Sequence, residues 1–215
     1  MKTICVISGG MDSTTLLYKL LADGKEVKAI SFNYGQRHAR ELKCAALTCL
    51  QLHIPHKIID ISYIKELVSN SALTSDIAVP EGHYEAENMK LTVVPNRNMI
   101  MASMAIGYAI NEGFDEVALG VHAGDHHIYF DCRSVFIKAL ATVAELCDEH
   151  PINIYTPFLN IDKGDIAIEG KKLGVDYSLS WTCYKGENAP CGKCGACVER
   201  KQAFEKAEMN DPLIK

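Results

Sequence analysis

Apolar segments of strand length alternate with segments of helical periodicity along most of the chain, and this alternation constrains the fold more than any other sequence feature. Residues 2–7 are rich in β-branched side chains and run into glycines, which is typical of a buried strand followed by a tight turn. Residues 12–21 carry leucines at helical spacing, and we expect Asp12 or Ser13 to cap this helix. This repeated β-α order predicts a parallel sheet with helices on both faces.

The same order continues along the rest of the chain. Further strands are expected at Glu26–Asn33, 57–61, 115–121 and 152–155. Further helices are expected at 37–52, 96–111, 131–148, Lys163–Leu173 and 197–208, with Gly174 ending the fourth of these. Residues 69–95 lack periodicity and are expected to form a long loop near the functional site.

Composition and charge limit the classes of function that this chain can have. The 215 residues are 48% hydrophobic and 23% charged, as in an ordinary globular protein. The 22 Lys and Arg residues against 27 Asp and Glu give a net charge of -5, which argues against binding nucleic acid mainly by neutralising phosphates. The N-terminal apolar run is too short for a signal peptide, and 99–110 is too short for a membrane-spanning helix. We therefore expect a cytoplasmic protein without membrane partners.

A glycine-containing string, Ser8-Gly9-Gly10-Met11-Asp12-Ser13-Thr14, lies between the first strand and its helix, where a doubly wound fold builds a phosphate site. Glycines let the backbone approach a phosphate, and free N–H groups at the helix start point at the anion. The hydroxyl groups add donors, whereas Asp12 would repel phosphate unless it capped the helix or held a Mg²⁺ ion. The alternative is a plain strand-to-helix turn in which the glycines serve only geometry.

Two further polar segments lie where parallel strands end or helices begin. Ser31-Phe32-Asn33 closes the second strand and borders the same crevice, and Arg37 after it either contacts substrate or phosphate or forms the polar first turn of a helix. Arg97 opens a strongly apolar helix and can bind a carboxylate or phosphate through two hydrogen bonds, although a surface charge is the alternative.

The segment after the fourth strand contains His122, Asp125, His126 and His127. A catalytic metal is one interpretation, but two adjacent histidines rarely both point at one ion, so we favour a polar substrate pocket. Asp131 is a candidate N-cap for the next helix. Cys132 could act as a nucleophile with a nearby histidine as base, although nothing in the sequence requires it.

Four cysteines fall within fifteen residues, at Cys183, Cys191, Cys194 and Cys197. Four thiolates without a histidine favour a closed, tetrahedral, structural zinc site. An iron–sulfur cluster and a thiol–disulfide pair are the alternatives; the first is disfavoured because Lys201-Gln202 stands where the next Cys-Pro pair belongs. The predicted fold is an α/β doubly wound, mostly parallel sheet over 1–176 with a small C-terminal zinc-binding lobe over 177–215, packed as one compact unit.

Several of these motifs resemble known families. Ser8-Gly9-Gly10-x-Asp12-Ser13 resembles the pyrophosphate loop of the N-type ATP pyrophosphatases, which have the adenine nucleotide alpha hydrolase-like fold. Together with 32–38, 94–98, 120–133, 163–165, 181–184 and the four cysteines, in that order, it resembles the 7-cyano-7-deazaguanine synthase family over nearly the whole chain. That family has Ser-Gly-Tyr-Pro-Asp-Cys-Arg where this chain has 127–133, so Asp131-Cys132-Arg133 is matched and the residues before it depart.

The resemblance implies a reaction and a set of functional residues. ATP, with Mg²⁺, would adenylylate 7-carboxy-7-deazaguanine, and free ammonia would give first an amide and then the nitrile, in queuosine or related deazapurine biosynthesis. ATP contacts are expected from residues 8–14 and 31–33 and zinc binding from the four cysteines. Catalytic roles are expected for Asp12, Ser13, Arg97, Asp131 and Arg133, and substrate contacts for Arg37, Arg97, Asp125, Asp131 and Arg133. A homodimer is expected from the family.

Two other functions stay open from sequence. One keeps the ATP chemistry but transfers sulfur to a tRNA base, which the acidic balance and the zinc-like cysteine spacing disfavour. The other is a zinc-ribbon nucleic-acid binder on an inert scaffold, with a basic set at Lys171, Lys172, Lys185, Lys193, Arg200 and Lys201.

Overall fold

A five-stranded parallel sheet forms the centre of the computed structural model, which describes residues 1–37, 40–84, 86–185 and 188–214. Its strands are β1 (Lys2–Val6), β2 (Glu26–Asn33), β3 (His56–Asp60), β4 (Glu116–Ala118) and β5 (Asn153–Tyr155). Their order in the sheet is β3-β2-β1-β4-β5, with every neighbouring pair parallel. The chain moves outward from β1 to β3 and then returns to place β4 beside β1, which confirms the predicted doubly wound fold.

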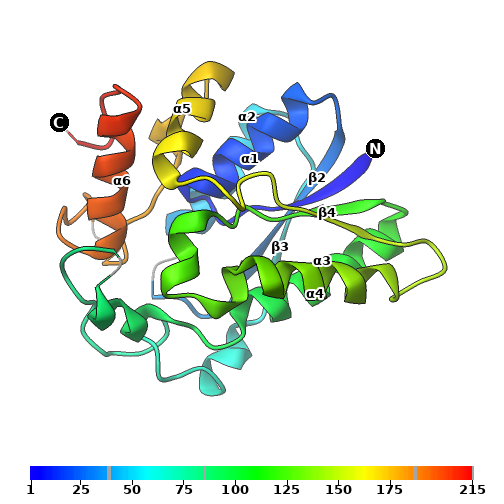
Figure 1. Cartoon of the computed structure of the whole chain (residues 1–215), viewed down its shortest axis with the longest axis horizontal. Coiled ribbons are helices and arrows are strands. Elements are labelled where there is room, and N and C mark those ends of the chain that lie inside the picture. The colour runs from blue at the N-terminus through cyan, green and yellow to red at the C-terminus, as the bar shows by residue number, and fades with distance from the viewer. Residues whose placement is uncertain (38–39, 85, 186–187, 215) are drawn as a thin grey trace.

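Helices cover both faces of the sheet (Figure 1). One face carries α1 (Met11–Ala22), α2 (Arg40–Gln51) and α5 (Lys163–Leu173), and the other carries α3 (Arg97–Glu112) and α4 (Ser134–Glu145). The last helix, α6 (Gly195–Lys206), packs against α5. Successive side chains of a strand point to opposite faces, so Ile4 joins the α3–α4 core while Cys5 joins the core under α1 and α2.

The start of α1 differs from the prediction. The N-cap residue is Gly10, without a side-chain cap, so the expected cap by Asp12 or Ser13 is wrong. Both residues lie inside the first turn of α1, where Ser13 Oγ contacts Ser8 and donates to the Gly10 carbonyl at 3.3 Å.

The predicted helix 131–148 is shorter than expected. Residues Phe130–Cys132 form a single 3-10 turn, and α4 begins at Ser134 with Arg133 as its N-cap residue. The expected N-cap role of Asp131 for this helix is therefore wrong. The Asp131 carboxylate instead accepts a hydrogen bond from the backbone N–H of Asn98 at 3.0 Å, in the first turn of α3. The N-cap residue of α3, Asn96, has a left-handed backbone (φ 58) and offers no side-chain cap of its own.

Two other helices begin elsewhere than predicted. Arg37 precedes α2, and its N–H donates to the carbonyl of Leu73; His38 and Ala39, also predicted helical, lie outside the described residues. The last helix begins at Gly195 rather than at Cys197, immediately after Cys194 as its N-cap residue.

The non-periodic segments gather beyond the carboxyl ends of the strands (Figure 1). Five 3-10 turns lie in this part of the fold, η1 (Ser62–Glu66), η2 (Glu87–Thr92), η3 (Ala123–His127), η4 (Phe130–Cys132) and η5 (Tyr177–Leu179). The loop 69–95 is joined to the cysteine segment by a bridge between Glu81 and Cys194 and by the N–H of Gly82, which donates to Lys193 at 3.0 Å. None of the described helices combines the length and apolarity that crossing a bilayer requires.

Candidate active site and metal centre

A cavity lies at the carboxyl ends of β1, β2 and β4, at the topological switch point of the sheet. The loop after β1 lines one side of it, and aromatic and charged side chains from distant segments line the rest. The principal lining residues are Ser8, Gly10, Asp12, Ser13, Phe32, Tyr34, Glu41, Tyr84, Arg97, Asp125, Lys163 and Trp181.

The loop after β1 is held in shape by its own hydrogen bonds. The backbone N–H of Ser8 donates to Ser13 Oγ at 3.1 Å, and that of Gly10 donates to Ser8 Oγ at 3.2 Å. The first three N–H groups of α1 have no helical acceptor, because the first helical bond runs from Thr14 to Gly10. Donors that point out of a helix start beside two hydroxyls form an anion-binding arrangement.

Glycine is required at the second position of this loop. Gly9 has φ +87, and a Cβ there would lie 1.9 Å from the carbonyl oxygen of Glu41. The loop therefore packs directly on the backbone of the first turn of α2, which no side chain at this position would allow.

Asp12 faces a buried group of charged side chains. Its Oδ2 lies 3.4 Å from Lys163 Nζ and 3.8 Å from His122 Nε2. Its Oδ1 is buried without a hydrogen-bond partner among the described residues. Lys163 Nζ also contacts Glu199 Oε2 at 2.5 Å, so one ammonium joins carboxylates from α1 and α6.

The charge state of this group follows from its geometry. Burial alone would lower the pKa of Lys163, but the neighbouring carboxylates, Asp12 first among them, outweigh burial and raise it. Burial alone would raise the pKa of Asp125, but His122, Lys163 and a 2.8 Å hydrogen bond from the Tyr84 hydroxyl lower it. The cavity thus holds a lysine cation and, in Asp125, a carboxylate whose pKa lies below its ordinary value.

Arg97 forms no ion pair among the described residues, although its charge acts to lower the pKa of both Glu41 and Asp125 across the cavity. Its guanidinium lies 3.4 Å from the Tyr34 hydroxyl, and no carboxylate of the described residues lies within 4.0 Å of it. Burial alone would lower the pKa of Arg97, but Tyr34 and the other nearby groups raise it. A partly buried guanidinium on a cavity wall is suited to bind an anion.

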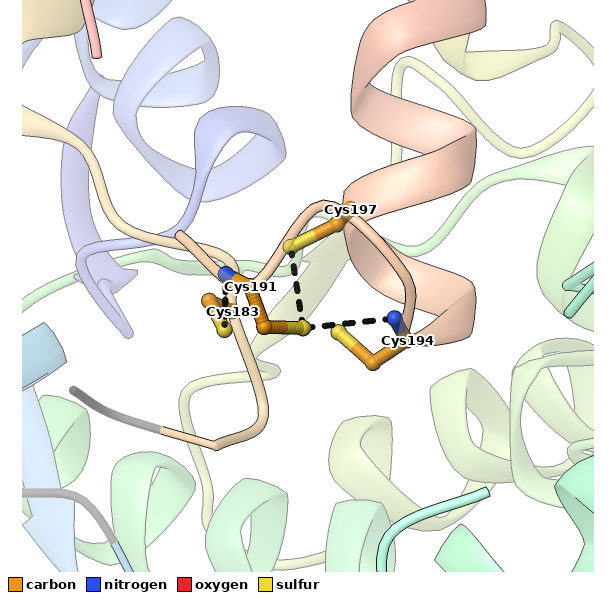
Figure 2. Close-up of side chains that lie close together, drawn as sticks. All are labelled: Cys183, Cys191, Cys194 and Cys197. Atoms are coloured by element: carbon orange, nitrogen blue, oxygen red, sulfur yellow. Dashed lines mark hydrogen bonds between the residues drawn. The ribbon is translucent and has the colours of Figure 1, made fainter. Parts of the chain in front are cut away.

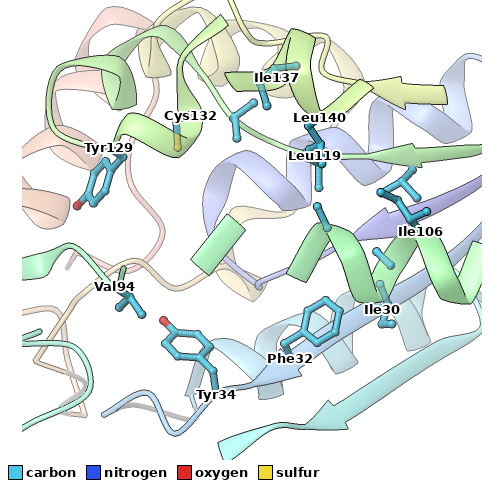
Figure 3. Close-up of a cluster of buried hydrophobic side chains, with 14 of the residues drawn as sticks. Ile30, Phe32, Tyr34, Val94, Ile106, Leu119, Tyr129, Cys132, Ile137 and Leu140 are labelled. Carbon is cyan, nitrogen blue, oxygen red and sulfur yellow. The ribbon is translucent and has the colours of Figure 1, made fainter. Parts of the chain in front are cut away.

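Apolar and aromatic side chains also line the cavity. Figure 3 shows Phe32 and Tyr34 at the end of β2, with Leu119 and Cys132 from the segments that follow β4. Burial raises the pKa of the Cys132 thiol, and Asn98 Nδ2 donates to its sulfur at 3.1 Å. This environment disfavours the thiolate that a nucleophilic Cys132 would need.

The four cysteines of the C-terminal segment converge (Figure 2). All four Sγ atoms lie within 4.8 Å of one another, and they are the one set of three or more possible ligands gathered this closely in the part of the chain that the structure describes. Tetrahedral thiolates around zinc stand about 3.8 Å apart. Backbone N–H groups of Cys191 and Cys194 donate to Sγ of Cys183 and Cys191, each at 3.3 Å, which stabilises thiolates. The set could hold a metal such as zinc.

Trp181 connects the four-cysteine set to the loop after β1, residues 8–14, which we call the phosphate-type loop. Its backbone N–H donates to the carbonyl of Gly9 at 2.9 Å, and its indole N–H donates to the carbonyl of Cys183 at 3.1 Å. The Arg40 guanidinium lies 3.9 Å from the centre of the buried indole ring.

A protein-family model described as "Queuosine biosynthesis protein QueC" matches residues 2–208. The chain belongs to the QueC family. The 7-cyano-7-deazaguanine synthase of Methanoregula boonei is 52% identical over 213 residues, covering 99% of this chain and 98% of the relative. The protein of the same name from Hahella chejuensis is 53% identical, covering 99% of this chain and 92% of the relative. These matches confirm the family expected from the motifs.

Solved structures with the same fold are more distant. NMN synthetase from Francisella tularensis has a TM-score of 0.56 at 16% identity, covering 97% of this chain and 77% of that one. The U34-tRNA thiolase NcsA from Methanococcus maripaludis has a TM-score of 0.52 at 19% identity, covering 95% and 64%. At these identities the likeness shows the fold alone.

The predicted nucleotide-binding residues of this QueC-family chain differ in how they meet the cavity. Ser8, Gly10, Asp12, Ser13 and Phe32 line it. The side chains of Met11 and Thr14 are buried away from it, so the α1 backbone is what they bring to the site.

Ser31 and Asn33 are engaged locally. The Ser31 hydroxyl donates to the carbonyl of Ile7, and Asn33 Oδ1 accepts from the N–H of Gly35 at 3.2 Å.

The predicted substrate residues divide in the same way. Arg97 and Asp125 line the cavity, whereas three others are engaged outside its lining. The exposed Arg37 donates to the carbonyl of Ile77 at 3.1 Å, and Arg133 donates to the carbonyl of His126 at 2.8 Å while stacking on Phe130. Asp131 caps α3, the helix that begins with Arg97.

Sequence reasoning missed three charged residues of the site. Lys163 was part of a matched segment without an assigned role, and Glu199 and Glu41 carried no motif. Glu41 lines the cavity from the first turn of α2, and burial raises its pKa to about 7. A carboxylate or lysine that acts through a distant partner leaves no local pattern.

Proposed function

We propose that this QueC-family protein is an ATP-dependent carbon–nitrogen ligase that converts 7-carboxy-7-deazaguanine and ammonia into 7-cyano-7-deazaguanine. One observation carries the proposal: a loop suited to bind an anion lines the same cavity as the Arg97 guanidinium, which has no carboxylate within 4.0 Å among the described residues. A ligase of this class must hold a triphosphate and a carboxylate side by side. Near full-length relatives that carry the name 7-cyano-7-deazaguanine synthase support the same reaction.

Adenylylation explains why ATP is needed. A carboxylate resists attack because oxide is a poor leaving group, whereas AMP is a good one. Attack by ammonia on the acyl-adenylate releases AMP and leaves the amide. Adenylylation of the amide oxygen by a second ATP then permits elimination of AMP to the nitrile, and each activation releases pyrophosphate.

The loop after β1 is suited to bind the phosphates. The N–H groups at the start of α1, the hydroxyls of Ser8 and Ser13, and the Lys163 ammonium would contact them where negative charge develops. Asp12 fits Mg²⁺, because its buried Oδ1 lacks a partner among the described residues and carboxylate oxygens are favoured magnesium ligands. When bound, Mg²⁺ supplies positive charge that offsets the charge of the phosphates.

The opposite wall is suited to the acid. Arg97 would bind its carboxylate, and the ionised Asp125 would accept hydrogen bonds from ring N–H groups. Phe32, Tyr34 and Tyr84 offer ring surfaces for a flat bicyclic substrate. Asp131 would act indirectly, by capping the helix that begins with Arg97.

Zn²⁺ is the metal that the cysteine set fits best. Four thiolates close the tetrahedral coordination shell, so the ion would hold the segment together and leave no open position for catalysis. A homodimer stays a proposal that rests on the family resemblance, and a cytoplasmic location stays a proposal that rests on the sequence.

A nucleic-acid-binding function is less well supported. Four of the six basic residues pair with acids of the chain: Arg200 with Asp211 at 2.7 Å, Lys185 with Glu81 at 2.6 Å, Lys201 with Glu205 at 3.7 Å and Lys172 with Glu169 at 3.7 Å. Lys171 donates to the carbonyl of Ala207 at 2.9 Å. A set of this kind offers little free charge to a phosphate backbone.

The test incubates the protein with Mg-ATP, ammonia and 7-carboxy-7-deazaguanine, and follows the nitrile by mass spectrometry and pyrophosphate by a coupled assay. Asp12→Ala should abolish turnover while the zinc content stays the same. Arg97→Met should raise KM for the acid without weakening ATP binding, whereas Arg37→Met should leave both unchanged. No nitrile at substrate-level enzyme would reject the proposal.

A further inference from the structure

Lys163 lies where the start of α5 meets α1 and α6. It is the first residue of α5, its side chain is 8% exposed, and its Nζ lies between Asp12 from α1 and Glu199 from α6. A lysine stem has several rotatable bonds and a compact charge, so a single distant carboxylate does not fix its position. A second carboxylate on the other side of the ammonium does fix its position.

Glu199 makes the closer of the two contacts. Its Oε2 lies 2.5 Å from Lys163 Nζ, against 3.4 Å for Asp12 Oδ2, and its side chain is 12% exposed. The other carboxylate oxygen, Oε1, faces Gly124 of η3, where an added Cβ would approach to 3.1 Å. Glu199 is therefore enclosed on the side of η3 while it holds Lys163.

The position of Glu199 depends in turn on the metal centre. The helix α6 begins directly after Cys194, and the N–H groups of Cys197 and Val198 donate to the Cys194 carbonyl at 2.9 and 3.0 Å. Glu199 lies two residues beyond Cys197 on this first turn and a half of helix. Whatever fixes Cys194 and Cys197 also fixes the direction from which Glu199 meets Lys163.

We propose that Glu199 is a positioning residue that holds the Lys163 ammonium beside Asp12 and the phosphate-type loop, and so makes ATP binding depend on the cysteine centre. Without Glu199, Lys163 has Asp12 as its carboxylate partner and is drawn onto it, away from the phosphates. The inference rests on the proposed ATP binding, but it concerns a residue that the reaction chemistry does not itself require.

A competing electrostatic role predicts the opposite sign. Glu199 adds a negative charge near the phosphate site, so if it acted only by charge, its removal would strengthen ATP binding. A purely structural role in docking α6 predicts a third pattern, in which every variant of Glu199 weakens binding whether or not Lys163 is present.

A double-mutant cycle separates these roles. Mg-ATP affinity is measured by calorimetry on the metal-loaded protein, without acid or ammonia, for the wild type, Glu199→Ala, Lys163→Met and the double variant. We expect Glu199→Ala to weaken binding about tenfold in the wild-type background and to have no further effect in the Lys163→Met background. Glu199→Gln, which still accepts a hydrogen bond from the ammonium, should recover part of the loss.

Glu205→Ala is the matched control, because Glu205 lies on the same helix with a 62% exposed side chain paired to Lys201, and it should leave the affinity unchanged. Zinc content is determined for each variant, and if Glu199→Ala loses metal the cycle is run with Glu199→Gln. Equal losses in both backgrounds, or tighter binding by the Glu199 variants, would overturn the inference. If the wild type itself does not bind Mg-ATP, the proposed function fails first.

Discussion

Replacing Gly9 by alanine tests whether the loop after β1 is held by its contact with α2. The residue has φ +87, and an added Cβ would lie 1.9 Å from the Glu41 carbonyl oxygen, 2.8 Å from the Glu41 carbonyl carbon and 2.9 Å from the Ala45 nitrogen. All three are backbone atoms, so no side-chain rotation can relieve the overlap.

The magnitude has two parts. A left-handed backbone costs an L residue about 1–2 kcal/mol. Moving the Glu41 oxygen from 1.9 Å to the shortest tolerated contact, near 3.0 Å, displaces the loop or the first turn of α2 by about 1 Å. Overpacking of this kind adds about 1–3 kcal/mol of destabilisation. A displacement of about 1 Å at a positioned site can lower the rate about 100-fold.

Gly24→Ala is the matched control. Gly24 also has a positive φ, at +70, but an added Cβ there meets nothing within 4 Å. Urea unfolding should therefore give a loss of about 1–2 kcal/mol for Gly24→Ala, and a larger loss for Gly9→Ala. Mg-ATP affinity should fall only for Gly9→Ala. Equal stability losses together with unchanged ATP affinity would refute the packing argument.

Three further predictions concern the metal, a buried acid and a helix cap. Removing the metal by chelation should speed hydrogen exchange in 181–201 more than in the sheet. It should also weaken Mg-ATP binding, because the Trp181 N–H donates to the Gly9 carbonyl. An unchanged ATP affinity would contradict this link. The pKa of Glu41 is about 7 in the folded protein, against an ordinary value of 4.5. The folded protein therefore keeps this proton to a higher pH than the unfolded chain does. As the pH rises from 4.5 to about 7, Glu41 consequently lowers the free energy of unfolding. Glu41→Gln should flatten that decline, as measured by urea unfolding between about pH 5 and pH 8. Asp131→Ala should cost about 1 kcal/mol by removing the acceptor for the Asn98 N–H, with Asp131→Asn losing less; equal losses for the two variants would argue against a capping role.

Local patterns predicted the elements well where the determinants are local. The strand Glu26–Asn33 and the helix Lys163–Leu173 have the predicted bounds, and Gly174 in a left-handed conformation defines the end of the helix. The predicted bounds of an element were wrong where a tertiary contact competes with the local sequence pattern. Asp131 looked like the cap of its own helix, but its carboxylate bonds to Asn98 across the fold.

The predictions for the candidate site divide in the same way, between residues set by local patterns and residues set by tertiary contacts. Ser8 and Ser13 line the cavity and the four cysteines converge, and the sequence could single them out because a phosphate loop and a metal set need particular residue types at short spacing. Arg37, Arg97 and Arg133 looked alike as arginines near helix starts, yet only the first turn of α3 brings its guanidinium, that of Arg97, to the cavity. A single charged residue carries no spacing that distinguishes a cavity wall from a surface.

The sequence by itself determined the order of strands and helices along the chain, the glycine loop after β1, the cysteine set and the family, since each depends on residues close together in the chain or on their order along it. The tertiary structure alone decided that Glu199 meets Lys163, that Trp181 meets Gly9 and that Arg97 contacts the Tyr34 hydroxyl at the cavity. These contacts join elements that the chain topology brings together from far apart. Coulombic attraction and hydrogen bonding act on distance in space, which the linear order of residues does not record.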